Sequence, residues 1–338
     1  MSAQDSLYPG PFSWRFLHPR HASGWLAVLL LGLVSLLPTR WRLALGAWLG
    51  RLAYERHAKR RTIVHINLEL CFPEKHAAER EALARAFFRQ FMQTVLDYGL
   101  LWWGSGRAID ARVTLEGEEH LRPHLEAGRP VILLTGHHVA VDFAGIAVNR
   151  RHRKATSMFK RLRSPVLDWF VARGRTRQGG LMFERHDNLR PLVRLIRDGY
   201  MFYYMPDEDL GPDKSVFAPF FGVPSATLTA LAKLTRLCNA VVVPFMAYHH
   251  EGHYTARLFP ALENYPSGDD VQDAARMNQA LEAMIRIDPS QYMWSLRLFQ
   301  TRPDGLTDPY PRKGRPKQAV GEGQEGQRGG RGDAEVTE

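Results

Sequence analysis

Cysteine is scarce in this chain of 338 residues, which contains only Cys71 and Cys238. The two lie far apart in apolar surroundings, so they provide neither a disulfide framework nor the close spacing of metal ligands. A chain without such a framework is typical of a reducing compartment. The sequence therefore excludes a small disulfide-stabilised secreted domain and a cysteine-ligated metal centre.

A hydrophobic run long enough to cross a membrane is also lacking. Residues 24–37 are apolar and uncharged, but Pro38 ends the run short of the roughly 20 residues that a spanning helix needs. Basic residues flank the run and no A-x-A-like cleavage site follows it, which argues against a cleaved secretory signal.

Tryptophan and basic residues continue from this run to residue 61. Aromatic side chains beside cations favour contact with an anionic membrane surface. We therefore interpret residues 1–61 as a membrane anchor followed by a basic amphipathic segment, with a helix over 41–61. The alternative is a buried N-terminal helix of a soluble protein.

Acidic residues are too few to balance the basic ones, since 35 Asp and Glu face 45 Lys and Arg and leave a formal charge of +10. Residues 150–177 alone carry ten basic side chains and one acid, Asp168. Nucleic acid, anionic lipid and phosphorylated small molecules would all suit such a segment. A solvated helical face is the plainer alternative.

From residue 113 onward, short β-rich runs alternate with helical patterns. Strands are expected at 130–136, 155–159, 200–206, 240–248 and 253–260, and helices at 141–149, 164–174, 188–199 and 227–239. This alternation predicts an α/β fold, with a mostly parallel central sheet and helices on both faces, preceded by the N-terminal membrane-anchoring helical segment. We expect a catalytic domain over 62–310 and a disordered tail over 311–338, which lacks large apolar residues.

His137 and His138 follow the strand expected at 130–136, where ligands bind in a parallel sheet. Asp142 comes shortly after them, and a histidine bonded to a carboxylate is the usual general-base arrangement. Spacing alone favours a pairing of His138 with Asp142, four residues apart on a helix. His137 can reach Asp142 only if it lies outside that helix. No serine or cysteine nucleophile stands at a sharp turn here, so a base would act directly on a substrate hydroxyl.

Two further polar groups invite a metal interpretation. Asp207, Glu208 and Asp209 follow another expected strand and form either a D-x-D metal site or a turn whose acids cap the next element or contact acceptor hydroxyls. The run HHEGH, residues 249–253, has Gly252 at a bend between two expected strands, so a solvated hairpin turn is favoured over a metal cluster.

Several blocks of the chain, in order, resemble the late acyltransferases of lipid A biosynthesis. They are FLHPRH, NLELCFPE, GHHVAVDF, YYMPDEDLGPDKSVFAPFFG, VVPF and QYMWSLRLFQTRPDG, and the resemblance runs from about residue 16 to residue 310. These enzymes belong to a wider group of membrane acyltransferases that share a His-x4-Asp signature. That signature falls on His137 and Asp142, because His138 would have Phe143 at the required position.

The resemblance implies transfer of a fatty acyl chain from acyl carrier protein to a hydroxyl on the acyl chains of a Kdo-bearing lipid A precursor. It implies His137 as the base, Asp142 as its orienting and charge-stabilising partner, and backbone N–H groups near Val139 or an arginine for the oxyanion. Arg175 and Arg177 match a Gly-Arg-x-Arg block and are expected to contact substrate. Asp207 and Asp209 match an acidic block and are assigned to substrate binding.

The same resemblance implies a location at the cytoplasmic face of the bacterial inner membrane, with membrane lipid as a partner. It implies no metal and no other cofactor, and it gives nucleic acid no role. The blocks are divided between two subfamilies, of which we favour the one that adds lauroyl first over the one that adds myristoyl second. More remote alternatives are an enzyme that acylates glycerol phosphates and a non-catalytic anionic-lipid-binding protein.

Overall fold

The computed structural model describes residues 8–152, 154–184 and 189–311. Its strands are β1 (Val113–Glu116), β2 (Val131–Leu134), β3 (Ala155–Phe159), β4 (Leu181–Glu184), β5 (Met201–Tyr204), β6 (Ser215–Phe220), β7 (Val223–Leu228), β8 (Val241–His250) and β9 (His253–Leu258). Its α-helices are α1 (Ala22–Ser35), α2 (Thr39–Arg56), α3 (Ala58–Cys71), α4 (Ala77–Trp103), α5 (Gly106–Asp110), α6 (Arg122–Glu126), α7 (Val141–His152), α8 (Pro165–Thr176), α9 (Leu189–Arg197), α10 (Ala230–Cys238) and α11 (Asp270–Ile287). The tail expected over 311–338 lies outside the described residues, apart from its first residue.

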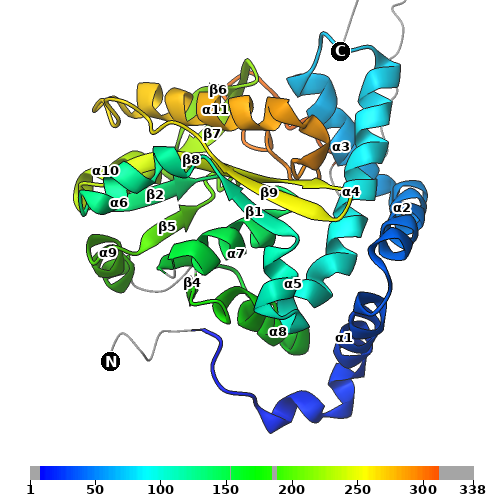
Figure 1. The fold of residues 1–338 in the computed structure, drawn as a ribbon. Helices are drawn as coiled ribbons and strands as arrows, with labels where there is room; N and C mark the ends of the chain where they lie inside the picture. Colours follow the sequence, from blue (N-terminus) through cyan, green and yellow to red (C-terminus); the bar gives the residue numbers. More distant parts are fainter. Residues whose placement is uncertain (1–7, 153, 185–188, 312–338) are drawn as a thin grey trace, which may run out of the picture.

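The central sheet is mostly parallel, as predicted. Over the described residues it has seven strands in the order β1-β9-β8-β2-β5-β3-β4. Strands β2, β3, β4, β5 and β8 run in one direction, whereas β9 returns antiparallel to β8 and pairs with β1 in parallel. Figure 1 shows α7 on one face of this sheet and α11 on the other. Every residue of β2 is buried, so the core lies along the middle of the sheet.

The sequence pattern located most of these elements. The strands expected at 130–136, 155–159 and 200–206 are β2, β3 and β5, and the HHEGH run is the turn of the β8–β9 hairpin. Glu251 and Gly252 both have positive φ there, as a tight hairpin turn requires. The antiparallel pair β6–β7 was not predicted, since Pro219 and Pro224 interrupt its strands and lie opposite each other.

The amino-terminal helices pack along α4. The helix expected at 41–61 is two helices, because the chain turns at His57 between α2 and α3. The domain boundary expected at residue 61 therefore falls inside α3. Close contact depends on glycine: a Cβ at Gly46 or Gly50 of α2 would lie within 2.7 Å of backbone atoms of α4, and one at Gly99 of α4 within 2.4 Å of Ser35.

The outer side of α1 and α2 carries large apolar side chains that face solvent. Leu26, Leu29 and Leu33 of α1 are each more than half exposed, and so are Trp41 and Trp48 of α2. No helix in the described part of the chain is both long and apolar enough to span a membrane.

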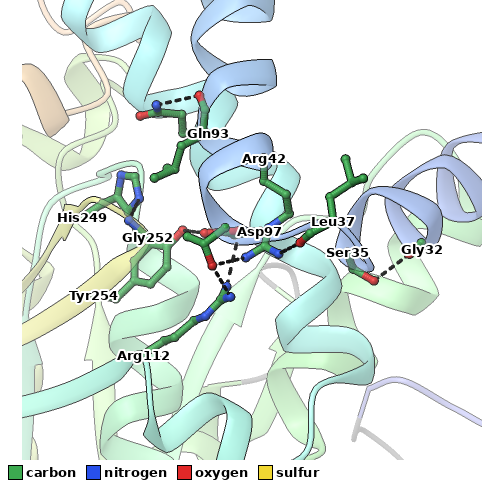
Figure 2. A network of polar contacts seen from close by, with 12 residues as sticks. Gly32, Ser35, Leu37, Arg42, Gln93, Asp97, Arg112, His249, Gly252 and Tyr254 are labelled. Atoms are coloured by element: carbon green, nitrogen blue, oxygen red, sulfur yellow. Dashed lines mark hydrogen bonds and ion pairs between the residues drawn. The ribbon is translucent and has the colours of Figure 1, made fainter.

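A buried charge network fixes the junction between α1 and α2 to the rest of the protein. The Arg42 side chain donates to Asp97 of α4 at 2.8 Å and to the carbonyl of Leu37 at 2.6 Å. Tyr254 of β9 donates to the other Asp97 oxygen at 2.8 Å, and Arg112 lies 3.9 Å away (Figure 2). One carboxylate therefore joins the amino-terminal helices, α4 and the edge of the sheet.

Candidate functional site

His137 and Asp207 meet at the carboxyl edge of the sheet because their strands are in register. Leu134, the last residue of β2, pairs with Tyr204, the last residue of β5. His137 and Asp207 each lie three residues beyond that pair, so two positions 70 residues apart in sequence come into contact. Parallel strands end at the same edge, which is where ligands bind in such sheets.

The Asp207 carboxylate accepts hydrogen bonds from three donors. The Nδ1 atom of His137 lies 2.6 Å from Oδ1, the backbone N–H of His137 donates to Oδ2 at 2.6 Å, and the Tyr292 hydroxyl donates to Oδ2 at 2.8 Å. Burial raises the pKa of Asp207, but the charge and hydrogen bonds of His137 outweigh it and leave that pKa lowered. Asp207 is therefore ionised at neutral pH.

This arrangement defines the tautomer of His137. An ionised carboxylate only accepts, so the proton of the neutral imidazole lies on Nδ1 and the lone pair on Nε2. The side chain is 26% exposed, and Glu208 lies 3.9 Å from Nε2. A half-buried imidazole that is oriented by a carboxylate through Nδ1 has the geometry of a general base.

The carboxyl-terminal segment after η6 (Pro289–Gln291) holds the turn that carries His137. The backbone N–H of Val139 donates to the Gln291 carbonyl, and that of Met293 to the His137 carbonyl, each at 2.9 Å. The Tyr292 hydroxyl between them reaches Asp207. The block QYMWSLRLFQTRPDG thus fixes both members of the His137–Asp207 pair.

His138 is fully buried and has a different environment. Its Nε2 accepts from the backbone N–H of Ala247 at 3.1 Å, so its Nδ1 carries the proton and donates to the Gly136 carbonyl at 2.8 Å. Burial lowers its pKa to about 4. A neutral, enclosed imidazole with both nitrogens in use connects the turn to β8 and offers nothing to a substrate.

Asp142 has other partners than the one we expected. The carboxylate that orients His137 through Nδ1 is that of Asp207, whereas Asp142 accepts from Arg175 Nε at 2.5 Å, from Arg175 Nη2 at 3.2 Å and from the Tyr98 hydroxyl. The reason is direction: Asp142 lies in the first turn of α7 and faces α4 and α8, which supply these two donors. Burial lowers the pKa of Arg175, but Asp142 outweighs this effect and raises it, so the pair is ionised.

Two of the residues assigned to substrate binding have structural partners. Arg177 donates to backbone carbonyls at the end of α4, those of Leu101, Trp102 and Gly104. Asp209 accepts from the backbone N–H groups of Thr301 and Gly211. These contacts match the turn-capping interpretation of the acidic run and leave Arg175 as the expected arginine nearest the site.

The basic segment over 150–177 is also partly neutralised within the protein. Five of its arginines hold carboxylates or backbone carbonyls, namely Arg150 with Asp110, Arg151 with Glu118, Arg161 with Glu184, Arg175 with Asp142, and Arg177 with α4. Half of its ten basic side chains therefore have partners within the protein.

A small apolar cavity of about 50 Å³ adjoins the Asp142–Arg175 pair. Leu133, Ile146, Met158 and Met182 contribute apolar walls, and Gly145 leaves part of the α7 wall open. The ion pair lies in the wall of this cavity, so an apolar chain and a polar reacting group could be placed side by side.

Metal ligation finds no support in the described residues, among which no three His, Cys, Asp or Glu side chains are arranged to hold an ion. In the HHEGH run, His249 is buried and bonded to Gln90 and to the turn at Gly252. In the YYMPDEDLG block, Asp207 and Asp209 accept hydrogen bonds from protein donors.

Two tyrosines of the site were not singled out from the sequence. Tyr98 lies in a long helix and Tyr292 in an irregular segment, and neither has a local pattern that indicates contact with a carboxylate. The available signal was indirect, since Tyr292 belongs to one of the blocks that carry the family resemblance.

The described residues thus contain a hydrogen-bonded His137–Asp207 pair at the sheet edge, and a buried Asp142–Arg175 pair in the wall of an apolar cavity. The profile of the family described as "Bacterial lipid A biosynthesis acyltransferase" matches residues 10–301. The chain is 36% identical to "Lipid A biosynthesis acyltransferase" of Haemophilus influenzae, over 88% of this chain and 94% of that protein.

Two relatives from Escherichia coli are about equally similar. The chain is 35% identical to "Lipid A biosynthesis myristoyltransferase" over 91% of its own length and 96% of the relative. It is 35% identical to "Lipid A biosynthesis lauroyltransferase" over 88% of its own length and 98% of that relative. The chain belongs to the bacterial lipid A biosynthesis acyltransferase family and is an acyltransferase.

Proposed function

We propose that this protein transfers a fatty acyl chain, lauroyl in preference to myristoyl, from acyl carrier protein to a hydroxyl on the acyl chains of Kdo2-lipid IVA. The observation that carries the proposal is the His137–Asp207 pair at the carboxyl edge of the sheet, in a chain whose family acts in lipid A biosynthesis. A carboxylate-oriented imidazole suits direct attack by a substrate hydroxyl, and the sequence places no serine or cysteine nucleophile at a sharp turn next to it.

In the proposed reaction, Nε2 of His137 accepts the proton of the acceptor hydroxyl as its oxygen attacks the thioester carbonyl. The tetrahedral intermediate then collapses, the C–S bond breaks, and the imidazolium returns its proton to the thiolate of the donor. Asp207 keeps Nδ1 protonated and stabilises the imidazolium while it exists. No covalent acyl-enzyme forms.

Arg175 is the candidate for the negative charge that develops on the thioester oxygen. The backbone N–H group of Val139, near which we had expected such donors, already donates to the Gln291 carbonyl, and that of His137 donates to Asp207. Asp142 holds Arg175 in a fixed orientation through Nε and Nη2. Fixed donors of this kind stabilise a transition state without reorganisation.

The order of acylation rests on sequence blocks. VHINLELCFPE and QYMWSLRLFQTRPDG resemble the enzymes that add lauroyl first, whereas HHVAVDF and GYMFYYMPDED resemble those that add myristoyl second. Myristoyl transfer to the lauroylated precursor is therefore the second candidate.

Mass spectrometry of lipid A from cells with and without this protein tests the proposal. Loss of one lauroyl chain, restored by wild-type protein but not by His137→Ala, is the expected result. Loss of myristoyl alone would favour the second candidate, and unchanged lipid A would contradict both.

We also propose that α1 and the start of α2 lie on the cytoplasmic face of the inner membrane. The support is the solvent-facing apolar surface of these helices, next to the basic residues that follow. Changing Leu26, Leu29 and Leu33 to Gln should move the protein from washed membranes to the soluble fraction without unfolding it, since these side chains are exposed.

The matched control for this experiment changes three exposed leucines elsewhere, Leu189, Leu210 and Leu306, to Gln. If both triple variants remain with the membrane fraction, the proposed surface does not hold the protein there.

A further inference from the structure

A large groove of about 940 Å³ lies apart from the catalytic edge, between α2, the first half of α4 and the end of α11. Its floor is shallow and made of small side chains, Ala47 of α2 with Ala82 and Ala86 of α4. Small residues at such positions let another helix approach closely. The sequence analysis gave this region no role beyond the amphipathic pattern of its helices.

The groove is lined by five cations and two carboxylates. The cations are Arg51, Lys75, Arg85, Arg89 and Arg286, and the carboxylates are Glu79 and Asp288. Three of the cations have a glutamate one helical turn away, but these are solvent-exposed pairs with separations of 2.6 to 3.9 Å. Exposed pairs of this kind contribute little energy and are readily exchanged for a better partner. The groove therefore presents positive charge over an apolar floor.

The groove is also connected to the catalytic turn. Ser290 lines it, and Tyr292, two residues later, donates to Asp207. Two residues span at most about 7 Å, and Gln291 between them is hydrogen-bonded to Val139 beside His137. A partner seated in the groove would therefore lie against the segment that holds His137 and Asp207.

We propose that this groove docks an acidic helix of the carrier protein that delivers the acyl chain. The inference rests on the proposed function, which makes that protein the donor. Charge complementarity steers and orients such a complex, and the alanine floor accommodates a helix backbone. A lipid phosphate would instead need cations that converge on one point, whereas these cations come from α2, α4, α11 and the segment before α4.

The double variant Arg51→Glu/Arg89→Glu tests the proposal, because both side chains are exposed and belong to different helices. With acyl carrier protein as donor, KM should rise at least tenfold, and its dependence on salt should weaken. With acyl-pantetheine, which carries the same thioester without the protein, kcat and KM should stay unchanged. The control Arg194→Glu/Lys233→Glu makes the same charge change on α9 and α10 and should behave like wild type with both donors.

Direct titration of carrier protein and sedimentation with phosphatidylglycerol vesicles complete the test. An unchanged KM for the carrier-bound donor, or an equal rise for both donors, would overturn the docking surface. So would a double variant that loses vesicle binding but keeps carrier binding, since the groove would then take lipid.

The docking surface and the proposed function fail in different ways. A wild-type enzyme that uses acyl-pantetheine but neither binds nor uses carrier protein would overturn the docking surface and the donor, while acyl transfer would stand. A wild-type enzyme that binds carrier protein through the groove but transfers no acyl chain from either donor would overturn the proposed function, while the docking surface would stand.

Discussion

Asp97 and Tyr98 are consecutive residues of α4 whose side chains enter two different polar networks. Asp97 accepts from Arg42 and Tyr254, and Tyr98 donates to Asp142 (Figure 2 shows the Asp97 network). A second link runs through the sheet, since the Tyr254 ring stacks on Phe143, the neighbour of Asp142, with 3.6 Å between centroids. The segment that fixes the amino-terminal helices therefore also positions the Asp142–Arg175 pair.

Loss of Arg42 should destabilise the whole protein. Arg42→Met leaves the buried Asp97 carboxylate without its main cation, and breaking a buried pair from one side typically costs about 3–5 kcal/mol. Urea unfolding should show this loss, whereas Arg40→Met, at an exposed position two residues earlier, should change stability by less than about 0.5 kcal/mol. Equal effects of the two substitutions would show that the Asp97 network is not a stabilising element.

The two adjacent histidines should respond differently to substitution. His137→Ala should lower kcat by at least about 10² in a protein that still folds, the usual contribution of a positioned general base. His138→Ala should lower the melting temperature, because it removes a buried side chain that bridges Gly136 and Ala247. A well-folded His138→Ala protein with the larger loss of turnover would refute the assignment of the base to His137.

Asp207 and Asp142 should be separable by the pH dependence of kcat/KM. Activity should rise with pH as His137 loses its proton, since only the neutral imidazole accepts one. Asp207→Asn should lower kcat by about 10² or more and move this rise to lower pH, because a neighbouring carboxylate favours the protonated imidazole.

Asp142→Asn should also lower kcat, through the loss of a fixed Arg175, but should leave the position of the pH rise in place. If the pH rise moves in Asp142→Asn and stays in Asp207→Asn, the two carboxylates have been assigned in the wrong order.

Gly145 should control the length of the acyl chain if the cavity beside Asp142 holds its end. A Cβ at Gly145 would meet no atom within 4 Å, and the residue is helical. Gly145→Ala should therefore stabilise the protein by about 0.5–1 kcal/mol. Gly145→Leu should fill the cavity and lower kcat/KM for long donors relative to short ones. An unchanged ratio between myristoyl and decanoyl donors in a folded variant would place the chain elsewhere.

Stability should fall on mild acidification, because two buried histidines resist protonation. Burial lowers the pKa of His138 and of His249 to about 4, against an ordinary value of 6.5. The unfolded chain takes up these protons as pH falls below 6.5, whereas the folded chain does so only near pH 4. Each histidine should therefore lower the free energy of unfolding by about 2 kcal/mol between pH 7 and pH 5.

Urea unfolding of His249→Gln at both pH values should show a smaller loss than wild type. His253→Gln in the same hairpin is the control, since that side chain is exposed and folding changes its surroundings little. If the loss of stability between pH 7 and pH 5 is the same in all three proteins, the pKa shift of His249 is contradicted.

Local sequence determined much of this protein. The apolar runs bounded by polar turns located the strands of the core, because a strand buried on both faces must be apolar throughout. The position of His137 directly after such a strand was enough to indicate a site at the sheet edge. The resemblance of several blocks distinguished His137 from His138, which spacing alone had ranked the other way.

Tertiary structure decided which side chains of the site are hydrogen-bonded to one another. Sequence proximity suggested Asp142 for His137, but the register of β2 and β5 brings Asp207 to its Nδ1, and strand order is not encoded in local pattern. Helix direction likewise turned Asp142 towards Tyr98 and Arg175, and Arg177 donates to backbone carbonyls at the end of α4. Local residues therefore set which groups could react, while long-range packing set which of them meet, because hydrogen bonds depend on distances that only the folded chain defines.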